Sequence, residues 1–154
     1  MELDRITDMD LVRKLITHPS VYCLLTDDYS PPAEEFEVNA HPAIWYVAAM
    51  NDDMLIGMFC LFPSNAVCWD VHVIMYPWAT PKEKWEAARQ LSPWLAQRTI
   101  CKRLTGSIPA SKRQAIVYAA QGFRMHYVGR QERAFMLDGR LQDLILFGRE
   151  VAKE

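Results

Sequence analysis

The feature that most constrains the fold is a block of three β-rich runs in the middle of the chain. The stretch AIWYVAAMNDDMLIGMFCLFP, residues 43–63, holds two of them around the polar turn Asn51-Asp52-Asp53, which is a hairpin signal. The third run, AVCWDVHVIMY, follows at residues 66–76. Its period of two predicts a strand with Cys68, Asp70, His72 and Ile74 on one face.

Before this block, the sequence predicts a strand at residues 3–6, a helix and a long acidic loop. The helix lies in TDMDLVRKLITHP, with Thr7 as the N-cap and Pro19 beyond its end. Its apolar stripe at helical spacing consists of Leu11, Val12, Leu15 and Ile16. Residues 22–42 are rich in Asp, Glu and Pro, which predicts a loop with one irregular helical turn. So long a loop is uncommon unless it has a function.

After the block, helices alternate with strands. We expect a helix over residues 81–99, which Pro93 kinks or splits at Ser92. The segment CKRLTGSIP predicts a short strand, and SKRQAIVYAAQGF predicts a second helix. Gly122 would supply the left-handed position at the end of that helix, with extended structure resuming at Phe123.

The chain closes with a second hairpin, in which ERAFML and LQDLILFG flank Asp138-Gly139, a dipeptide suited to a type I′ turn. Hairpins require antiparallel neighbours, whereas strand-helix-strand units favour parallel ones. Gly57, inside the first hairpin, predicts a bulge or a close backbone approach. The sequence therefore predicts one α/β domain over residues 1–154, with a mixed sheet.

Composition limits the classes of function. The 154 residues carry a formal net charge of −2 and are 51% hydrophobic, so neither disorder nor attraction to nucleic acid is indicated. Six basic residues leave nucleic-acid binding open as a weak alternative to a solvated face: Lys102, Arg103, Lys112, Arg113, Arg124 and Arg130.

The same reasoning predicts a cytoplasmic protein without metal. The apolar runs are shorter than the roughly 20 residues that span a bilayer, so no membrane partner is expected. The N-terminus MELDRITDMD is acidic where a signal peptide is basic. Cys23, Cys60, Cys68 and Cys101 form no C-x-x-C pair, which indicates free buried thiols and no zinc or other metal site.

The order of elements and several segments resemble the GNAT superfamily of N-acetyltransferases. The match runs from about Trp45 to Arg149 and includes LIGMF, VHVIMYP, YAAQGF and DGRLQDLILFGRE. Members often carry Y-x-x-x-G-F at the end of the last helix. The resemblance implies a GNAT-like, mostly antiparallel twisted sheet of six to seven strands, flanked by three to four helices.

A second resemblance concerns a branch of GNAT-like proteins encoded by tailed bacteriophages. It is carried by H-x-x-x-x-P from His72 to Pro77, by SIPAS, by G-F and by D-G-x-x-x-D. Some proteins of that branch are described as acetyltransferases, and others as head-assembly or virion-associated proteins.

Three residues are candidates for catalysis. The resemblance implies that Tyr118 protonates the leaving thiolate, although an aromatic that packs on a helix face fits equally well. Asp70 and His72 lie two apart on one strand face, so a carboxylate could orient an imidazole that accepts the proton of an ammonium group. The alternative is a buried, hydrogen-bonded polar couple that fixes the sheet.

The resemblance also implies acetyl-CoA as cofactor, held by the strand before the central helix and by the N-terminus of that helix. The residues placed to bind it are Ile74, Tyr76, Lys82, Lys84 and Ser111. GNAT enzymes usually carry Q/R-x-x-G-x-G/A at this turn, because close approach of the backbone to phosphate favours glycine.

Those glycines are absent here. Instead, Thr80-Pro81-Lys82-Glu83 has the pattern of a capping box with proline at N1. A second capping pattern, S-x-x-Q, runs from Ser111 to Gln114, where many members have Asn. A helix start whose amides are already bonded predicts poor affinity for nucleotide.

Two functions therefore remain open. One is an acetyl-CoA-dependent N-acetyltransferase, with a small-molecule or lysine amine as acceptor. The acidic loop of residues 27–37 lies where GNAT members build the acceptor site. A solvated loop face explains these acidic residues too. The other is a non-catalytic phage structural protein in head assembly, inside the virion or in ejection. It would bind phage structural proteins or its own copies through exposed Trp and Met, in host cytoplasm or virion.

Overall fold

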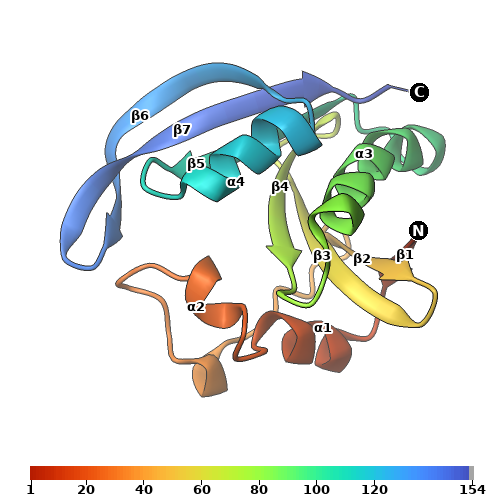
Figure 1. Ribbon diagram of the computed structural model, residues 1–154, viewed down its shortest axis with the longest axis horizontal. Helices are drawn as coiled ribbons and strands as arrows, with labels where there is room; N and C mark the ends of the chain where they lie inside the picture. Colours follow the sequence, from red (N-terminus) through yellow and green to blue (C-terminus); the bar gives the residue numbers. More distant parts are fainter. Residues whose placement is uncertain (153–154) are drawn as a thin grey trace.

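The computed structural model describes residues 1–152 and contains a seven-stranded sheet with helices on both faces (Figure 1). The strand order is β1-β2-β3-β4-β5-β7-β6. The strands β4 and β5 run parallel, and the other neighbours run antiparallel. This confirms the predicted mixed, mostly antiparallel sheet. In chain order the elements are β1 (Glu2–Ile6), α1 (Met9–Ile16), α2 (Tyr22–Leu25), η1 (Ala33–Glu35), β2 (Trp45–Asn51), β3 (Met54–Pro63), β4 (Cys68–Met75), α3 (Pro81–Arg98), β5 (Arg103–Pro109), α4 (Arg113–Val117), η2 (Tyr118–Gly122), β6 (His126–Leu137) and β7 (Arg140–Glu150).

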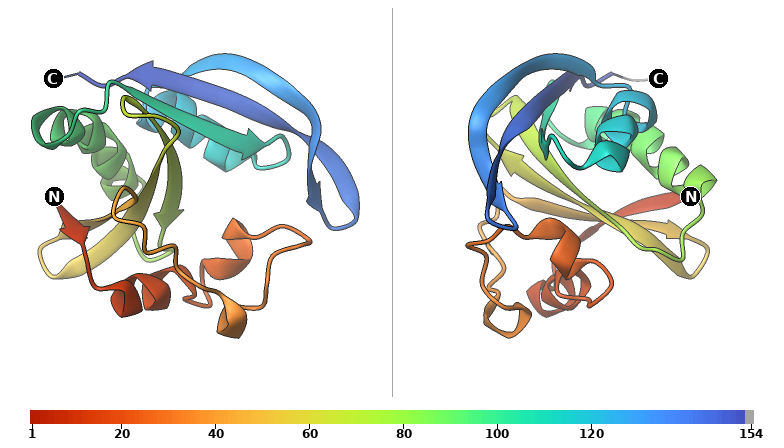
Figure 2. Two further views of the ribbon diagram at one scale, coloured as in Figure 1. Left: turned by 180° about the vertical axis from the view of Figure 1, so that it is seen from behind. Right: turned by 60° about the vertical axis from the view of Figure 1, so that its left-hand side comes forward.

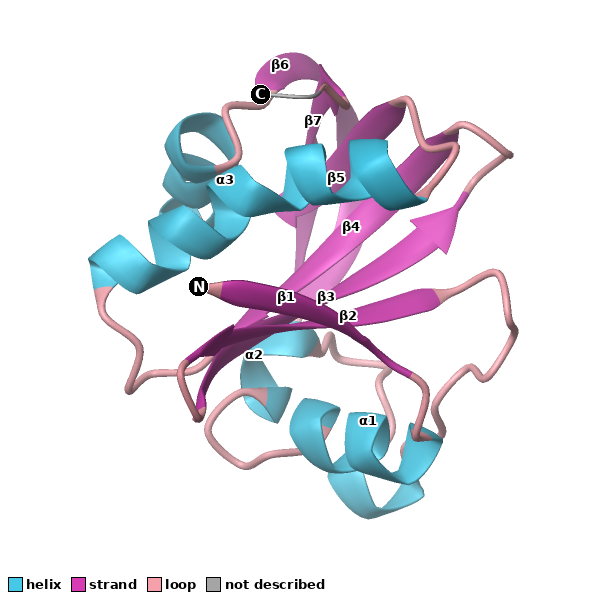
Figure 3. Ribbon diagram, turned by 90° about the vertical axis from the view of Figure 1, so that its right-hand side faces the viewer, coloured by secondary structure: helices cyan, strands magenta, loops and turns pink. Residues whose placement is uncertain are grey.

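Each face of the sheet carries its own apolar core, because successive strand residues point to opposite sides. Figure 3 shows α3 on one side of the sheet and α1 with α2 on the other. Ala88, Leu91 and Leu95 of α3 pack in the first core, and Val12 and Ile16 of α1 pack in the second. Within residues 1–152, no helix is both long and apolar enough to cross a membrane.

The first helix starts one residue later than the sequence predicts. The N-cap of α1 is Asp8, not Thr7, since the Asp8 carboxylate accepts the amides of Asp10 and Leu11 at 3.0 and 3.2 Å. Both residue types cap well, and local sequence does not separate them. Leu11 is 42% exposed, so the stripe is narrower than predicted. The following loop contains two short helical pieces, α2 and η1, in place of one irregular turn.

The predicted hairpin between β2 and β3 is confirmed, and Gly57 serves both predicted purposes. The register shifts between Ala49 and Met50, with Gly57 opposite Ala49. A Cβ on Gly57 would lie 2.3 Å from the carbonyl oxygen of Ile74 on β4. Only glycine therefore lets β3 approach β4 this closely.

The helix α3 is continuous through Pro93, so of the two outcomes predicted for this proline, a kink or a split at Ser92, the split is wrong. Proline removes one N–H and leaves the carbonyl of Arg89 without its helical partner. Arg89 is exposed, so water can reach that turn, and buried Leu91 and Leu95 hold the helix on the sheet on both sides of the proline. Packing outweighs the lost hydrogen bond.

The end of the last helix also differs from the prediction. Among the described residues, Gly139 is the glycine with positive φ, and Arg124, with φ of 56°, takes the left-handed position expected at Gly122. The helix widens into the π-helical turn η2, and Phe123 remains helical at φ −76° and ψ −15°. A Cβ on Gly122 would lie 2.9 Å from Cδ2 of Tyr118, so tight packing requires this glycine.

The long hairpin of β6 and β7 curves away from the sheet and approaches the acidic loop (Figure 2). Asp138 and Gly139 have φ of 53° and 73°, which confirms the predicted type I′ turn. Their amides donate to the Asp28 carboxylate at 2.7 Å each. This contact ties residues 27–37 to the hairpin tip.

Candidate functional site

The candidate site lies where the two parallel strands separate. β4 and β5 are paired at Cys68 with Arg103, Trp69 with Leu104, and Asp70 with Thr105. Beyond these pairs, β4 continues to Met75 along β3, and β5 continues to Pro109 along β7. The strands therefore diverge, and backbone groups on their facing edges become available to a ligand.

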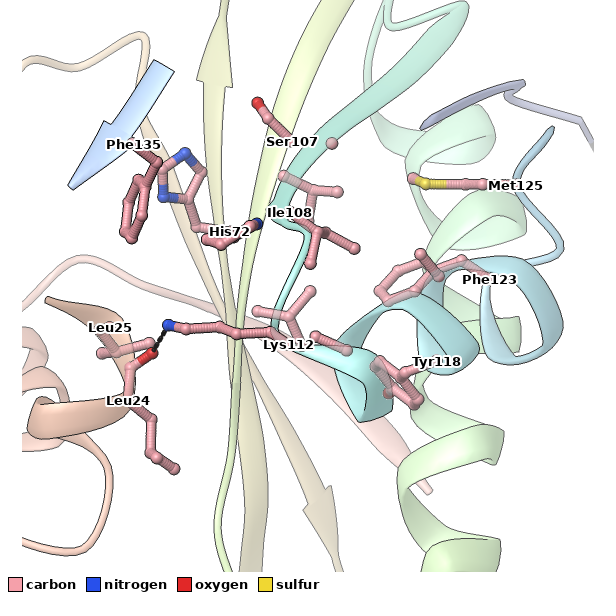
Figure 4. A pocket seen from close by; sticks show the side chains of 16 residues that line it. Leu24, Leu25, His72, Ser107, Ile108, Lys112, Tyr118, Phe123, Met125 and Phe135 are labelled. Atoms are coloured by element: carbon pink, nitrogen blue, oxygen red, sulfur yellow. Dashed lines mark hydrogen bonds between the residues drawn. The ribbon is translucent and has the colours of Figure 1, made fainter. Parts of the chain in front are cut away.

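A cavity of about 230 Å³ occupies this divergence (Figure 4). Leu24 and Leu25 of α2 and Phe135 of β6 close it from the far side, and Phe123 and Met125 line its wall near η2. Among its lining residues the polar side chains are His72, Ser107, Lys112 and Tyr118. No carboxylate from the described residues lines it, and the acidic loop contributes none.

The structure brings Asp70 and His72 together on one face of β4, as predicted. His72 Nε2 lies 3.0 Å from Asp70 Oδ2, and the Thr105 hydroxyl donates to Asp70 Oδ1 at 3.1 Å. The side chains are 62% and 26% exposed for His72 and Asp70, so the couple is hydrogen-bonded but not buried. With Nε2–H donating to Asp70, the lone pair of the imidazole lies on Nδ1, where it can accept a proton.

The ring of Tyr118 lines the cavity, whereas its hydroxyl is bound elsewhere. The hydroxyl donates to the carbonyl of Lys84 in α3 at 2.5 Å, and the ring packs edge-to-face on Phe123. Burial raises the pKa of the Tyr118 hydroxyl, which keeps it protonated at neutral pH. The Tyr118 hydroxyl thus joins η2 to α3 in its protonated form.

The start of α3 confirms the predicted capping box. The Thr80 hydroxyl accepts the amide of Glu83 at 3.2 Å, and the Glu83 carboxylate accepts the amide of Thr80 at 2.8 Å. Asn51 also donates to Glu83 at 3.0 Å. The hydrogen bonds from the Thr80 backbone and then from Asn51 lower the pKa of Glu83. Pro81 has no N–H, and the Lys84 amide donates to the Thr80 carbonyl, so little of this turn is free.

The second capping pattern is not formed. The amide and the hydroxyl of Ser111 both donate to the Gln142 side chain, at 3.1 and 2.6 Å. The N-cap of α4 is Lys112, without a side-chain cap. A neighbouring strand supplies a better acceptor for Ser111 than its own helix does.

The five predicted cofactor contacts do not form one group. Ile74 and Ser111 line a second cavity of about 500 Å³, which adjoins the first. Tyr76 is buried, and its hydroxyl donates to the Leu15 carbonyl at 2.7 Å. Lys82 and Lys84 line neither cavity.

The sequence predicts Lys112 as one of several basic residues on a solvated face, but the structure places it in the lining of the cavity. Its ammonium group donates to the Leu24 carbonyl at 2.6 Å, across 88 positions of the sequence. No local signal predicts a contact of that range.

Among the described residues, no group of three or more His, Cys, Asp or Glu side chains is arranged to hold a metal ion. All four cysteines are free thiols, as predicted. Cys60 and Cys101 are buried as predicted, whereas Cys68 is only half-buried and Cys23 is exposed in α2.

Comparison of the chain with known sequences and with solved structures gives matches only among the solved structures. No protein-family model and no curated protein matches the sequence. Among solved structures, a spermidine N-acetyltransferase from Vibrio cholerae in complex with CoA and spermine matches with a TM-score of 0.75 and 16% identity, over 99% of this chain and 96% of that chain. A GNAT family acetyltransferase from Elizabethkingia anophelis with acetyl-CoA bound matches with a TM-score of 0.57 and 14% identity, over 70% of this chain and 76% of that chain.

The fold is that of the GNAT acetyltransferases. The protein smu.2055 from Streptococcus mutans UA159 shares it, with a TM-score of 0.72 and 12% identity over 99% of this chain and 100% of that chain. At such identities the likeness extends to the fold alone. It confirms the fold that the first resemblance implies, while the phage branch stays a prediction.

The GNAT fold implies coenzyme A, and the residues present fit only part of it. The separated edges of β4 and β5 offer backbone groups to an extended pantetheine arm, in the way that a sheet edge binds an extended peptide. The start of α3 offers a diphosphate little, because the amides of Thr80 and Glu83 are bonded, Pro81 has no N–H, and the Glu83 carboxylate lies at this turn. The site thus offers more contacts to a thioester arm than to the nucleotide.

Proposed function

We propose that this chain is a GNAT-type N-acetyltransferase that moves an acetyl group from a thioester, acetyl-CoA, to an amine. The observation that carries the proposal is the divergence of β4 from β5, which opens a cavity lined by both His72 and Tyr118. Acetyl transfer needs a base for the ammonium proton and an acid for the thiolate. Both residue types lie at one cavity.

His72 is proposed as the base. Its Nδ1 accepts the proton of the incoming ammonium group, while Asp70 holds Nε2 and stabilises the imidazolium that forms. Thr105 fixes the other oxygen of Asp70, which limits the rotation of that carboxylate. Asp70 is therefore a positioning residue in this scheme.

Tyr118 is proposed as the acid. Its ring lines the same cavity as His72, and its hydroxyl is protonated at neutral pH; a lower pKa in the thioester complex than in the resting state would favour proton transfer. Its hydroxyl must exchange the Lys84 carbonyl for the leaving sulfur, and a rotation within η2 is the motion that this requires. Turnover would therefore require Tyr118 to give up the hydrogen bond to Lys84 and part of its packing on Phe123.

The acceptor is proposed to be a small primary amine or a lysine side chain. The Vibrio cholerae neighbour was solved with spermine. Here no carboxylate of the described chain lines the 230 Å³ cavity, and Lys112 adds positive charge to its wall. Like charges repel more strongly at low dielectric, so an acceptor with one amine is favoured over a polyamine.

The test combines binding and turnover. Titration calorimetry with acetyl-CoA is expected to show weak binding, and an assay of thiol release with a panel of amines is expected to show transfer. His72→Gln should slow transfer by about 10²–10⁴-fold, and His126→Gln, at an exposed histidine outside the cavity, is the matched control. Absence of binding at millimolar acetyl-CoA, together with absence of thiol release, would refute the proposal.

A second candidate is a non-catalytic GNAT-fold component of a phage, in head assembly, inside the virion or in ejection. It is supported by the self-capped start of α3, which suits a helix that binds no phosphate. Exposed Met54 and Trp78 provide apolar surface, and they are near each other because Trp78 Nε1 donates to the Leu55 carbonyl. This role places the chain in host cytoplasm or virion. A monomer that never co-sediments with virions or assembly intermediates contradicts it.

A further inference from the structure

Lys112 lies at the junction of two cavities. The 230 Å³ cavity and the 500 Å³ cavity share five lining residues: Leu24, Leu25, Val73, Lys112 and Ala115. Figure 4 shows the Lys112 side chain extending from the start of α4 across the opening to the Leu24 carbonyl. The first cavity contains His72 and Tyr118, and the second is bounded by the end of β4 and the first turn of α4.

The surroundings of this amine are unusual for a lysine. Within residues 1–152 it forms no ion pair, and its hydrogen-bond partner is the neutral carbonyl of Leu24. The Phe135 ring lies 6.0 Å from Nζ, and Leu25 lines the same wall. Burial lowers the pKa of the Lys112 amine, opposed in part by Cys23. A larger fraction of neutral, nucleophilic amine follows than at an exposed lysine.

We propose that Lys112 is itself an acyl acceptor, so that a thioester bound between β4 and β5 acetylates its Nζ. The proposal rests on the proposed function for the identity of the donor. The Lys112 amine lies where the two cavities join. A donor carbonyl in one cavity and an acceptor amine in the other would react at this same position.

The reaction balances without a further reactant. The lone pair of neutral Nζ attacks the thioester carbonyl carbon, the new C–N bond forms, and the C–S bond breaks. The sulfur leaves as a thiolate and takes up a proton, while the amine gives one up. The products are an amide on Lys112 and a free thiol. The acetyl group would remain at the junction of the cavities and obstruct an external amine.

The test uses a small donor, S-acetyl-N-acetylcysteamine, which has a thioester and an amide but no nucleotide. The folded chain is incubated with it, and peptide mapping by mass spectrometry follows each lysine over time. Lys112 should be acetylated several-fold faster than exposed Lys14 and Lys102, and this preference should vanish in urea. Equal rates at the three lysines, or a preference that persists in urea, would overturn the proposal.

Variants separate this inference from the proposed function. Lys112→Arg keeps a charged donor for the Leu24 carbonyl and should remove the fast site, and Lys102→Arg is the matched control that keeps it. If Lys112→Arg does not fold, the time course of the unmodified chain still decides. Turnover of external amines without acetylation of Lys112 refutes the inference alone. Fast acetylation of Lys112 in a chain that does not bind acetyl-CoA supports the inference and refutes the proposed donor.

Discussion

Replacing Gly122 by alanine tests whether packing or backbone conformation requires this glycine. The new Cβ would lie 2.9 and 3.0 Å from two ring atoms of Tyr118, and 3.5 Å from Cβ of Ala88. Tyr118 cannot move aside freely, because its hydroxyl is bound to the Lys84 carbonyl and its ring packs on Phe123.

Two opposing terms set the magnitude. Overpacking of this kind costs about 1–3 kcal/mol. Alanine in helical conformation gains about 0.8–1.0 kcal/mol over glycine, and Gly122 is in η2 without positive φ. We therefore expect Gly122→Ala to lower the free energy of unfolding by roughly 0–2 kcal/mol, the difference between these two terms.

Urea denaturation measures the effect, and the decisive comparison is the same substitution in a Tyr118→Ala background. Without the ring, the clash is gone and only the helix term remains, so Gly122→Ala should become stabilising. Gly129→Ala is the control, since a Cβ there meets nothing within 4 Å. If Gly122→Ala is equally destabilising with and without the Tyr118 ring, the packing argument is wrong.

Three further predictions concern the cap, the base and the acid. The pKa of Glu83 in the folded protein is lowered from its ordinary value of 4.5. The stability that Glu83 contributes is therefore complete above pH 4.5 and is lost as the pH falls through the lowered pKa. Glu83→Gln should remove this part of the pH dependence of the urea midpoint. His72→Gln should reduce kcat by about 10²–10⁴-fold in the thiol-release assay if His72 is the base, and an unchanged rate would exclude that role. Tyr118→Phe removes the hydrogen bond to the Lys84 carbonyl, which should cost about 0.5–1.5 kcal/mol in urea denaturation. A loss of kcat with KM unchanged would support Tyr118 as the acid, whereas loss of stability alone would assign it to packing.

Contacts within a few residues could be predicted, because the interacting atoms are close for any path of the chain. The alternation of β4 places Asp70 and His72 on one face, and the two side chains meet as expected. The capping box at Thr80 and Glu83 needs only one turn of helix. The Asp138-Gly139 turn needs only two residues that tolerate positive φ.

Local reasoning failed where a residue from another element offered a better partner or a tighter neighbour. Ser111 has a sound capping pattern, but Gln142 of β7 takes both of its donors. Gly122 follows the pattern of a helix end, yet the ring of Tyr118 and Ala88 of α3 are what require it. Pro93 predicts a kink or a split, and the split does not occur because α3 packs on the sheet on both sides of the proline.

The amino-acid sequence by itself determined the order of strands and helices, both hairpin turns and the closed start of α3, since these depend on periodicity and on hydrogen bonds within one turn. Only the tertiary structure decided which groups share a cavity. Parallel pairing of β4 with β5 over three positions, followed by divergence, brings His72, Tyr118 and Lys112 to one opening. The contact from Lys112 to Leu24 exists only because α2 and α4 close that opening from opposite sides, which no local pattern encodes.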